Sequence, residues 1–320
     1  MQYFPGTEEA WFTTLKERIK DLINQISKED FKPPDRIKTV PKSKIIYVLE
    51  FILEILRVER RAVIEDILYS PKTRGEGRIR DRGELEQILY YIETTIQSPR
   101  EDFRLFEDIP SPIYGDLKVE YFSNLSTNDK VIRLNEKKSL SFIDPLMYRV
   151  NFMECNADKV LATSFDFEDL IRKGVAEKLN AVLVGLGNPP ARSTRNLLRR
   201  LYLELNLPVY ILTEATPDGL MQSISLIKGA LEPLPPFLQK FSVTHALWIG
   251  VSIGDLQENT RTSILEDQDM RKLDLIKGLP ISKLPPYKQE LELFQEKKFK
   301  ATIEDLGSLD IVKYVSDKIP

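Results

Sequence analysis

Beyond residue 160, short apolar runs alternate with amphipathic segments of helical spacing. The apolar runs are short enough to be buried strands, and they lie at residues 160–163, 181–184, 209–213 and 246–251. Helical periodicity is expected at 165–179, 193–205, 217–227, 264–278, 286–296 and 310–317. Strands that alternate with helices in this way form a parallel sheet covered by helices. This part of the chain is therefore expected to be a doubly wound α/β domain.

Ligand sites in such a sheet lie at the carboxyl ends of the strands, here near Thr163, Gly185 and Glu214. The segment Gly185-Leu186-Gly187 follows a strand, as the start of a dinucleotide-binding turn does. Pro189-Pro190 stands where a third glycine would open the helix, and the sequence contains no P-loop. The sequence therefore argues against a nucleotide site.

The first 125 residues follow a different pattern. Helices are expected at 7–26, 43–56, 61–69 and 84–97, with a linker up to Pro41 and a basic loop at 72–83. The periodicity then changes to two at 113–121, which indicates strands. Three short helices followed by a β-hairpin is the order of a winged-helix domain. We expect four segments: an N-terminal helix and linker at 1–40, a winged-helix domain at 41–125, a connecting segment at 126–150 and the α/β domain at 151–320.

Composition removes several classes of chemistry. Cys155 and His245 are the single cysteine and the single histidine of the 320 residues, so a disulfide framework and a multi-Cys/His zinc site are excluded. Both residues are expected to be structural. The longest apolar stretch, 45–56, is interrupted by Glu50 and Glu54 and is too short to span a bilayer. The N-terminal residues lack the basic start and apolar run of a signal peptide.

The net charge of −3 means that any nucleic-acid contact must come from local patches. Two arginine-rich patches are visible, and their members are Lys72, Arg74, Arg78, Arg80 and Arg82 in the first and Arg192, Arg195, Arg199 and Arg200 in the second. Such residues bind phosphate with salt-dependent affinity and little sequence preference. A solvated charged face is the alternative explanation for both patches.

Several sequence blocks occur in the order found in one family. They are VLEFILE (48–54), EDILY (65–69), PR (99–100), GDL (115–117), NFMECNAD (151–158), PARSTR (190–195), LLRRL (197–201), WIGV (248–251) and KATIEDL (300–306). The chain resembles the A subunit of DNA topoisomerase VI and the related meiotic double-strand-break transesterase, over about residues 40–320. The resemblance implies a winged-helix domain followed by a Toprim domain, a Rossmann-like parallel sheet. It also implies an archaeal source and a cytoplasmic, nucleoid-associated protein.

The resemblance assigns roles to individual residues. Tyr69 occupies the position of the tyrosine that attacks DNA and becomes linked to the broken end. The family's Mg²⁺ site takes a glutamate from the end of the first Toprim strand and an Asp-x-Asp pair from the end of the third. Ala162 stands at the glutamate position, and Glu214-Ala215-Thr216 stands at the Asp-x-Asp position. Asp218 is a possible substitute ligand, so Glu214 and Asp218 are expected to form a degenerate metal site.

Two further departures from the family weaken the case for cleavage. Ala191 replaces an aspartate, and Glu65 replaces an arginine that precedes the tyrosine. Tyr69 is accordingly either the nucleophile or a packing tyrosine at a helix end. Glu214 and Asp218 are either metal ligands or carboxylates that cap the helix starting at Pro217.

Three functions follow from these expectations. The first is a topoisomerase VI A-like homodimer that binds duplex DNA and whose Mg²⁺-dependent cleavage is weakened or lost. The second is an active enzyme that cuts DNA through Tyr69 and depends on an ATPase B subunit, because the chain shows no ATP-binding motif. The third is a non-catalytic scaffold that contacts a partner through the helix at 7–26.

Overall fold

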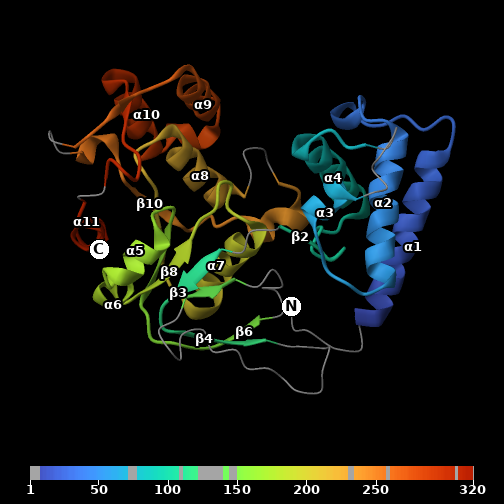
Figure 1. The fold of residues 1–320 in the computed structure, drawn as a ribbon, viewed down its shortest axis with the longest axis horizontal. Helices are drawn as coiled ribbons and strands as arrows, with labels where there is room; N and C mark the ends of the chain where they lie inside the picture. Colours follow the sequence, from blue (N-terminus) through green and yellow to red (C-terminus); the bar gives the residue numbers. More distant parts are fainter. Residues whose placement is uncertain are drawn as a thin grey trace. The chain divides into compact units, whose positions relative to one another are not determined.

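The computed structural model describes residues 8–70, 78–107, 111–121, 140–143, 150–229, 234–256, 260–306 and 309–319. The chain divides into two compact units, Met1–Asp108 and Ile109–Pro320 (Figure 1). Each unit has a hydrophobic core of its own. Among the described residues, no helix combines the length and the apolar character needed to cross a membrane.

The first unit is built around two long helices that pack against each other, α1 (Glu8–Ser27) and α2 (Lys42–Arg57). Helix α1 buries one stripe of side chains at helical spacing, which includes Leu15, Ile19 and Leu22. Helix α2 is apolar on most faces and supplies the centre of the core, as the sequence predicts. A short 3-10 helix, η2 (Asp35–Ile37), lies in the connection between the two.

Two further helices complete this unit, α3 (Ile64–Tyr69) and α4 (Arg82–Ile96). The side chain of Asp81 caps α4 by accepting a hydrogen bond from the backbone N–H of Glu84 at 2.9 Å. A two-residue parallel pair joins β1 (Ala62–Val63) to β2 (Leu105–Phe106). Helices α2, α3 and α4 follow the order that the sequence predicts for a winged-helix domain.

The strands expected to form the wing have other partners. They are β3 (Pro112–Tyr114) and β4 (Leu117–Tyr121), and both belong to the second unit. Strand β3 pairs with β8 (Ala181–Gly185), and β4 pairs with β6 (Val150–Cys155), both antiparallel. Gly115, at φ +135°, separates β3 from β4, and a Cβ at this position would clash with the backbone of Val182 on β8. The described residues of 111–121 therefore extend the second unit, and the winged-helix assignment stays a prediction.

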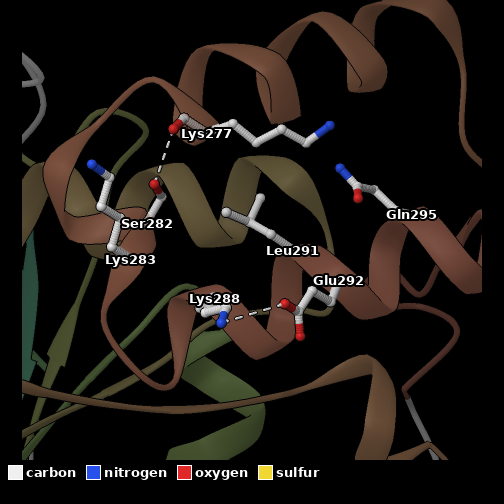
Figure 2. A pocket seen from close by; sticks show the side chains of 7 residues that line it. All are labelled: Lys277, Ser282, Lys283, Lys288, Leu291, Glu292 and Gln295. Atoms are coloured by element: carbon white, nitrogen blue, oxygen red, sulfur yellow. Dashed lines mark hydrogen bonds and ion pairs between the residues drawn. The ribbon is translucent and has the colours of Figure 1, made fainter.

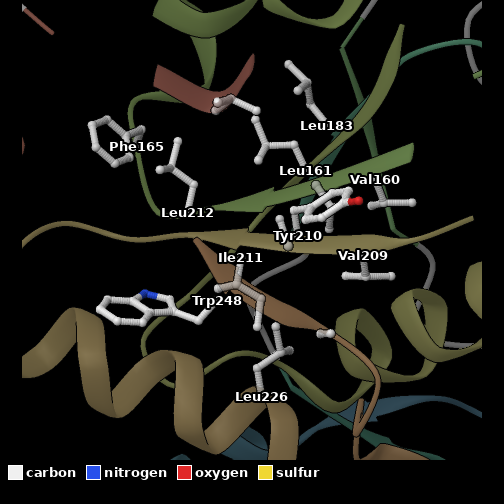
Figure 3. Close-up of a cluster of buried hydrophobic side chains, with 14 of the residues drawn as sticks. Val160, Leu161, Phe165, Leu183, Val209, Tyr210, Ile211, Leu212, Leu226 and Trp248 are labelled. Atoms are coloured by element: carbon white, nitrogen blue, oxygen red, sulfur yellow. The ribbon is translucent and has the colours of Figure 1, made fainter. Parts of the chain in front are cut away.

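The second unit contains a six-stranded sheet in the order β10-β9-β7-β8-β3-β5. Four neighbouring strands are parallel, as the sequence predicts: β7 (Lys159–Thr163), β8, β9 (Val209–Leu212) and β10 (Leu247–Gly250). Strand β3 and the short β5 (Ser141–Phe142) extend one edge in the antiparallel direction. The central strands are buried on both faces, and Val160, Leu161 and Ile211 lie in the resulting core (Figure 3).

Helices connect the parallel strands. Helices α5 (Phe167–Arg172) and α6 (Val175–Leu179) join β7 to β8, and Gly174 at φ +67° divides the single helix expected at 165–179. Helix α7 (Arg192–Leu205) joins β8 to β9, and α8 (Pro217–Lys228) follows β9. Because parallel crossovers are right-handed and the direction of strand addition reverses after β8, α5 and α6 cover one face and α7 and α8 the other. The reversal makes the carboxyl ends of β7 and β9 the topological switch point of the sheet.

The remaining elements of the second unit lie after β9 in the chain. The helices are α9 (Asp267–Lys277), α10 (Tyr287–Lys297) and α11 (Ile311–Lys318). The short 3-10 helices are η5 (Pro236–Phe241), η6 (Ile253–Asp255) and η7 (Pro280–Lys283). Strands β11 (Ser263–Ile264) and β12 (Phe299–Lys300) form an antiparallel pair. Helix α9 packs against α8, which places it beside the helix that starts just after β9.

Candidate functional site

The carboxyl ends of β7 and β9 are adjacent, because Thr163 is the register partner of Leu212. Ala162, on β7, is fully buried and carries no side-chain oxygen. Glu214 follows β9 by two residues, so its carboxylate is the acid nearest this strand end in the sequence. The position that the sequence resemblance equates with the family's first metal ligand therefore contributes only packing, as expected for Ala162.

Glu214 is held by two hydrogen bonds. Its Oε2 accepts the backbone N–H of Ile303 at 3.0 Å, and its Oε1 accepts the hydroxyl of Thr216 at 3.2 Å. Burial raises the pKa of the Glu214 carboxyl, and repulsion from Asp218 and Glu304 adds to this, against the two hydrogen bonds. Both carboxylate oxygens of Glu214 thus have partners within the protein.

Asp218 belongs to the first turn of α8, whose N-cap is Thr216. The Thr216 hydroxyl accepts the backbone N–H of Gly219 at 3.0 Å. A Cβ at Gly219 would clash with the carbonyl oxygen of Glu214, so glycine allows the helix to start this close to the turn. The Oδ2 of Asp218 lies 2.6 Å from the Nζ of Lys272, on α9. The structure brings Glu214 and Asp218 to one strand end, and each has a partner there.

This arrangement does not fit Mg²⁺. The ion requires near-octahedral coordination by oxygen, usually with one or two free carboxylates and several waters. Ala162 offers no ligand, Glu214 accepts two hydrogen bonds, and Asp218 is paired with an ammonium group. Across the described parts of the chain, no group of three or more His, Cys, Asp and Glu side chains is placed to hold a metal ion.

Several residues of this strand end were missed by the sequence analysis. Lys272 contacts Asp218, and Lys300 lies 2.6 Å from Asp269, one helical turn before Lys272 on α9. The residue after Lys300 forms a β-bridge with Ala215. The block at 300–306 was recognised in the sequence, but its position in the chain contains no information about where it packs.

Tyr69 is the last residue of α3, and its side chain is 82% exposed. Glu65 lies one helical turn earlier and forms an ion pair with Arg82 at the start of α4. Arg82 also contacts Glu86, with 2.9 Å between Nε and Oε1. Two carboxylates therefore surround Arg82, one of the predicted DNA contacts.

The other basic residues of the first patch follow Tyr69 in the sequence. Lys72 and Arg74 lie outside the described residues. Arg78 is exposed and has no ion-pair partner among the residues that the structure describes. Arg80 is largely exposed, and its Nε lies 3.3 Å from Glu84, a buried carboxylate that also binds Lys44. Arg78 is thus the most available cation of this patch among the described positions.

In the second patch, two arginines bind backbone carbonyls of their own unit. Arg195 is only 9% exposed and donates to the carbonyl of Gly229, which ends α8. Arg199 donates to the carbonyl of Gln239 at 2.9 Å. These contacts fasten α7 to the end of α8 and to η5, so they support the architecture of the sheet.

The other two arginines of α7 contact side chains. The guanidinium of Arg192 lies 5.2 Å from the ring centre of Phe241. Arg200 forms an ion pair with Glu204, one turn later, at 2.6 Å. Arg192 keeps part of its surface exposed, whereas the charge of Arg200 is neutralised locally.

The lone histidine and cysteine behave as structural residues. His245 stacks on Tyr202 with 3.6 Å between ring centres, and burial lowers the pKa of the imidazole, helped by Arg199. Burial raises the pKa of the Cys155 thiol, which favours the unreactive protonated form.

A basic hollow lies between α9, η7 and α10, with a volume of about 350 Å³ (Figure 2). Three lysines line it. Lys277 pairs with Asp274 at 3.2 Å and Lys288 with Glu292 at 3.9 Å. Lys283 has no ion-pair partner among the described residues. The lysines of this hollow could attract an anion. Among the described residues, however, the hollow is not lined by any buried polar group that lacks a hydrogen-bond partner.

Comparison with known proteins finds a family model that matches most of the second unit. Residues 161–319 match the model for the Toprim domain shared by Spo11 and the A subunit of topoisomerase 6. The match begins within β7 and includes β8, β9 and β10, so the parallel strands of the second unit are consistent with a Toprim domain.

Relatives extend this result to most of the chain. The chain is 29% identical over 275 residues to the A subunit of type 2 DNA topoisomerase 6 from Sulfurisphaera tokodaii, covering 79% of this chain and 69% of that protein. It is 26% identical over 258 residues to the protein of that name in Saccharolobus shibatae, covering 75% and 65%. For Archaeoglobus fulgidus the values are 25% over 279 residues, 86% and 77%. The chain is thus similar over most of its length to A subunits of type 2 DNA topoisomerase 6, as the sequence resemblance predicts.

Proposed function

We propose that this chain is a DNA-binding protein of the topoisomerase 6 A-subunit type in which Mg²⁺-dependent DNA cleavage is weakened or lost. The observation that supports this proposal best is the strand end of β7 and β9. Ala162 supplies no ligand there, and Asp218 is paired with Lys272. Phosphoryl transfer to a tyrosine needs a cation that neutralises charge on the phosphate and is held in a defined geometry. The described residues do not supply such a metal site.

The surroundings of Tyr69 point in the same direction. A tyrosine hydroxyl has a pKa near 10 in water and needs an activating neighbour to attack phosphate. Tyr69 is 82% exposed, and the charged residue one turn before it is the carboxylate of Glu65. Glu65 is paired with Arg82, so neither side chain offers the free positive charge that would attract a phosphate to the hydroxyl. We propose Tyr69 as the nucleophile of any cleavage activity that the protein retains.

DNA binding is proposed to depend mainly on Arg78 and Arg80. Both are exposed, and they follow the segment that contains Tyr69. Lys72 and Arg74 belong to the same basic loop in the sequence. Arg192 and Arg199 are proposed as weaker contributors, because each already has a partner within its unit. Phosphate contacts of this kind give an affinity that falls steeply with salt.

A cleavage assay tests the proposed loss of chemistry. The protein is incubated with supercoiled plasmid and Mg²⁺, with and without a topoisomerase 6 B subunit, and DNA covalently attached to protein is measured. We expect no covalent product under either condition. A product that disappears in Tyr69→Phe would show that the chain is an active enzyme that cuts duplex DNA through Tyr69.

A binding assay tests the proposed grip on DNA. Fluorescence anisotropy with a labelled duplex is measured over a salt series for the unaltered protein and for Arg78→Glu with Arg80→Glu. We expect the double reversal to weaken binding and to flatten the salt dependence. Lys20→Glu with Lys28→Glu, at two exposed positions of the same unit, is the control for a change in net charge. Equal loss in both double variants would refute a role for Arg78 and Arg80.

The assembly is proposed to be a homodimer that binds duplex DNA, and an ATPase B subunit is its possible further partner. Light scattering measures the dimer directly, because it has twice the 37.0 kDa of the chain.

A scaffold without DNA binding is the remaining candidate. Helix α1 was its expected docking element, but α1 buries Leu15, Ile19 and Leu22 inside its own unit. That contact favours a structural role for α1.

A further inference from the structure

The carboxylate of Asp218 is held by a lysine from another helix. The Nζ of Lys272, on α9, lies 2.6 Å from Oδ2 of Asp218, at the start of α8. Their side chains are 30% and 39% exposed, so the pair is partly shielded from water. Electrostatic attraction at such a site exceeds that of a fully solvated pair.

A second pair fixes the surroundings of the first. Asp269 lies three residues before Lys272, on the same side of α9, and its Oδ2 is 2.6 Å from the Nζ of Lys300. Lys300 is followed by Ala301, which forms a β-bridge with Ala215, next to Glu214. The fold therefore attaches both ammonium groups to the segment that leaves β9.

Two of the carboxylates at this strand end are neutralised without a metal ion. Asp218 pairs with Lys272 and Asp269 with Lys300, whereas Glu214 is repelled by Asp218 and Glu304. The remaining carboxylate, on Glu214, accepts a backbone N–H and a hydroxyl. A divalent cation at Oδ2 of Asp218 would have to displace Lys272, which already neutralises this carboxylate.

We propose that the ammonium group of Lys272 takes the place of a divalent cation as the countercharge of the carboxylates at the β7–β9 strand end. This inference rests on the proposed loss of Mg²⁺-dependent chemistry and names the residue responsible for it besides Ala162. An ammonium group donates three hydrogen bonds but cannot hold water and a phosphate oxygen in one coordination shell. The strand end is thereby stable without metal and closed to it.

The test is whether removal of the ammonium group creates a cation site. Lys272→Met keeps most of the aliphatic side chain and removes the charge. We expect this variant to bind Mn²⁺ at least tenfold more tightly than the unaltered protein, by isothermal titration calorimetry and by the electron paramagnetic resonance of bound Mn²⁺. Lys277→Met, on the same helix and paired with Asp274, is the matched control and is expected to leave the Mn²⁺ affinity unchanged.

Two results would overturn the proposal. One is Mn²⁺ binding by the unaltered protein as tight as that of Lys272→Met. The other is a folded Lys272→Met variant, by circular dichroism, without any gain in affinity. If the variant is unfolded without metal, refolding on addition of Mn²⁺ supports the proposal, and failure to refold refutes it. These titrations contain no DNA, so their outcome is independent of the binding and cleavage assays that test the proposed function.

Discussion

The guanidinium of Arg82 forms an ion pair with the carboxylate of Glu65, one helical turn before Tyr69. The same guanidinium lies 2.9 Å from Glu86. Because residues four apart share a side of a helix, Glu65 and Tyr69 face the same direction. Glu65 therefore places a carboxylate on the side of α3 that carries Tyr69, and it neutralises Arg82, which the sequence predicts as a DNA contact.

Replacement of Glu65 by arginine is expected to strengthen DNA binding. The change removes a negative charge, adds a positive one and releases Arg82 from one of its two carboxylates. Each additional phosphate contact steepens the slope of log affinity against log salt by about 0.9, so we expect a steepening of about one to two. Anisotropy titrations over a salt series measure the slope directly.

The control is Glu17→Arg, which makes the same charge change at an exposed position of α1. A slope that changes equally in Glu65→Arg and Glu17→Arg would mean that net charge matters and the position beside Tyr69 does not.

The buried ion pair between Arg100 and Glu93 is expected to stabilise the first unit. Arg100 is 3% exposed, and its Nη2 lies 3.1 Å from Glu93, which is fully buried. Arg100→Met leaves Glu93 charged in the core, so we expect the free energy of unfolding to fall by about 3–5 kcal/mol. Urea denaturation measures the loss. Arg172→Met, which breaks an exposed pair with Asp169, is expected to cost less than about 1 kcal/mol.

The position of the Arg100 side chain also shows what the sequence could not predict. The Pro99-Arg100 block is one of the sequence blocks that carry the family resemblance, and the sequence pattern contains no sign that Arg100 packs against α4. Two glutamates, Glu86 and Glu93, lie seven apart on one side of α4 and form the site for it. Pairing of charges over this distance depends on tertiary structure, which a local pattern does not contain.

The strands and helices themselves were largely predictable. The four parallel strands and α7 to α10 lie within a few residues of their expected bounds, because buried strands and amphipathic helices have strong periodicity. The partners of β3 and β4 were not predictable, since alternation identifies a strand but not its neighbour. The contact between Asp218 and Lys272 was not predictable for the same reason. The sequence identifies Asp218 as an acid at a strand end, but it contains no signal for a lysine partner 54 residues later.

A buried glutamate predicts a pH dependence of stability. Burial raises the pKa of Glu290, and Asp255 adds to this against hydrogen bonds from Ser252 and Ile253. A raised pKa in the folded state means that stability is greatest below the unfolded value of about 4.3 and falls as the pH rises through the folded value. In Glu290→Gln, Oε1 can still accept the Ile253 N–H and the amide can donate to the Ser252 hydroxyl.

We therefore expect Glu290→Gln to be more stable than the unaltered protein at pH 7.5 and to show a flatter pH dependence above about pH 4.3. Urea denaturation at pH 4.5, 6 and 7.5 measures both. The exposed Glu292→Gln, on the same helix, is the control and should follow the unaltered protein. Parallel pH profiles for all three proteins would show that Glu290 is not the titrating group.

Arg195, on α7, is expected to contribute to the stability of the protein and not to DNA binding. Arg195 is almost completely buried and donates to the carbonyl of Gly229 at the end of α8. Arg195→Met is expected to lower the free energy of unfolding by about 1–3 kcal/mol, the cost of an unsatisfied buried polar group. DNA affinity and its salt slope should stay unchanged, because a guanidinium that faces a carbonyl inside the unit does not reach phosphate. Denaturation and anisotropy on the same preparation test both statements, with the exposed Arg271→Met as the control. A folded Arg195→Met protein that binds DNA more weakly would instead mean that Arg195 leaves Gly229 to contact the duplex.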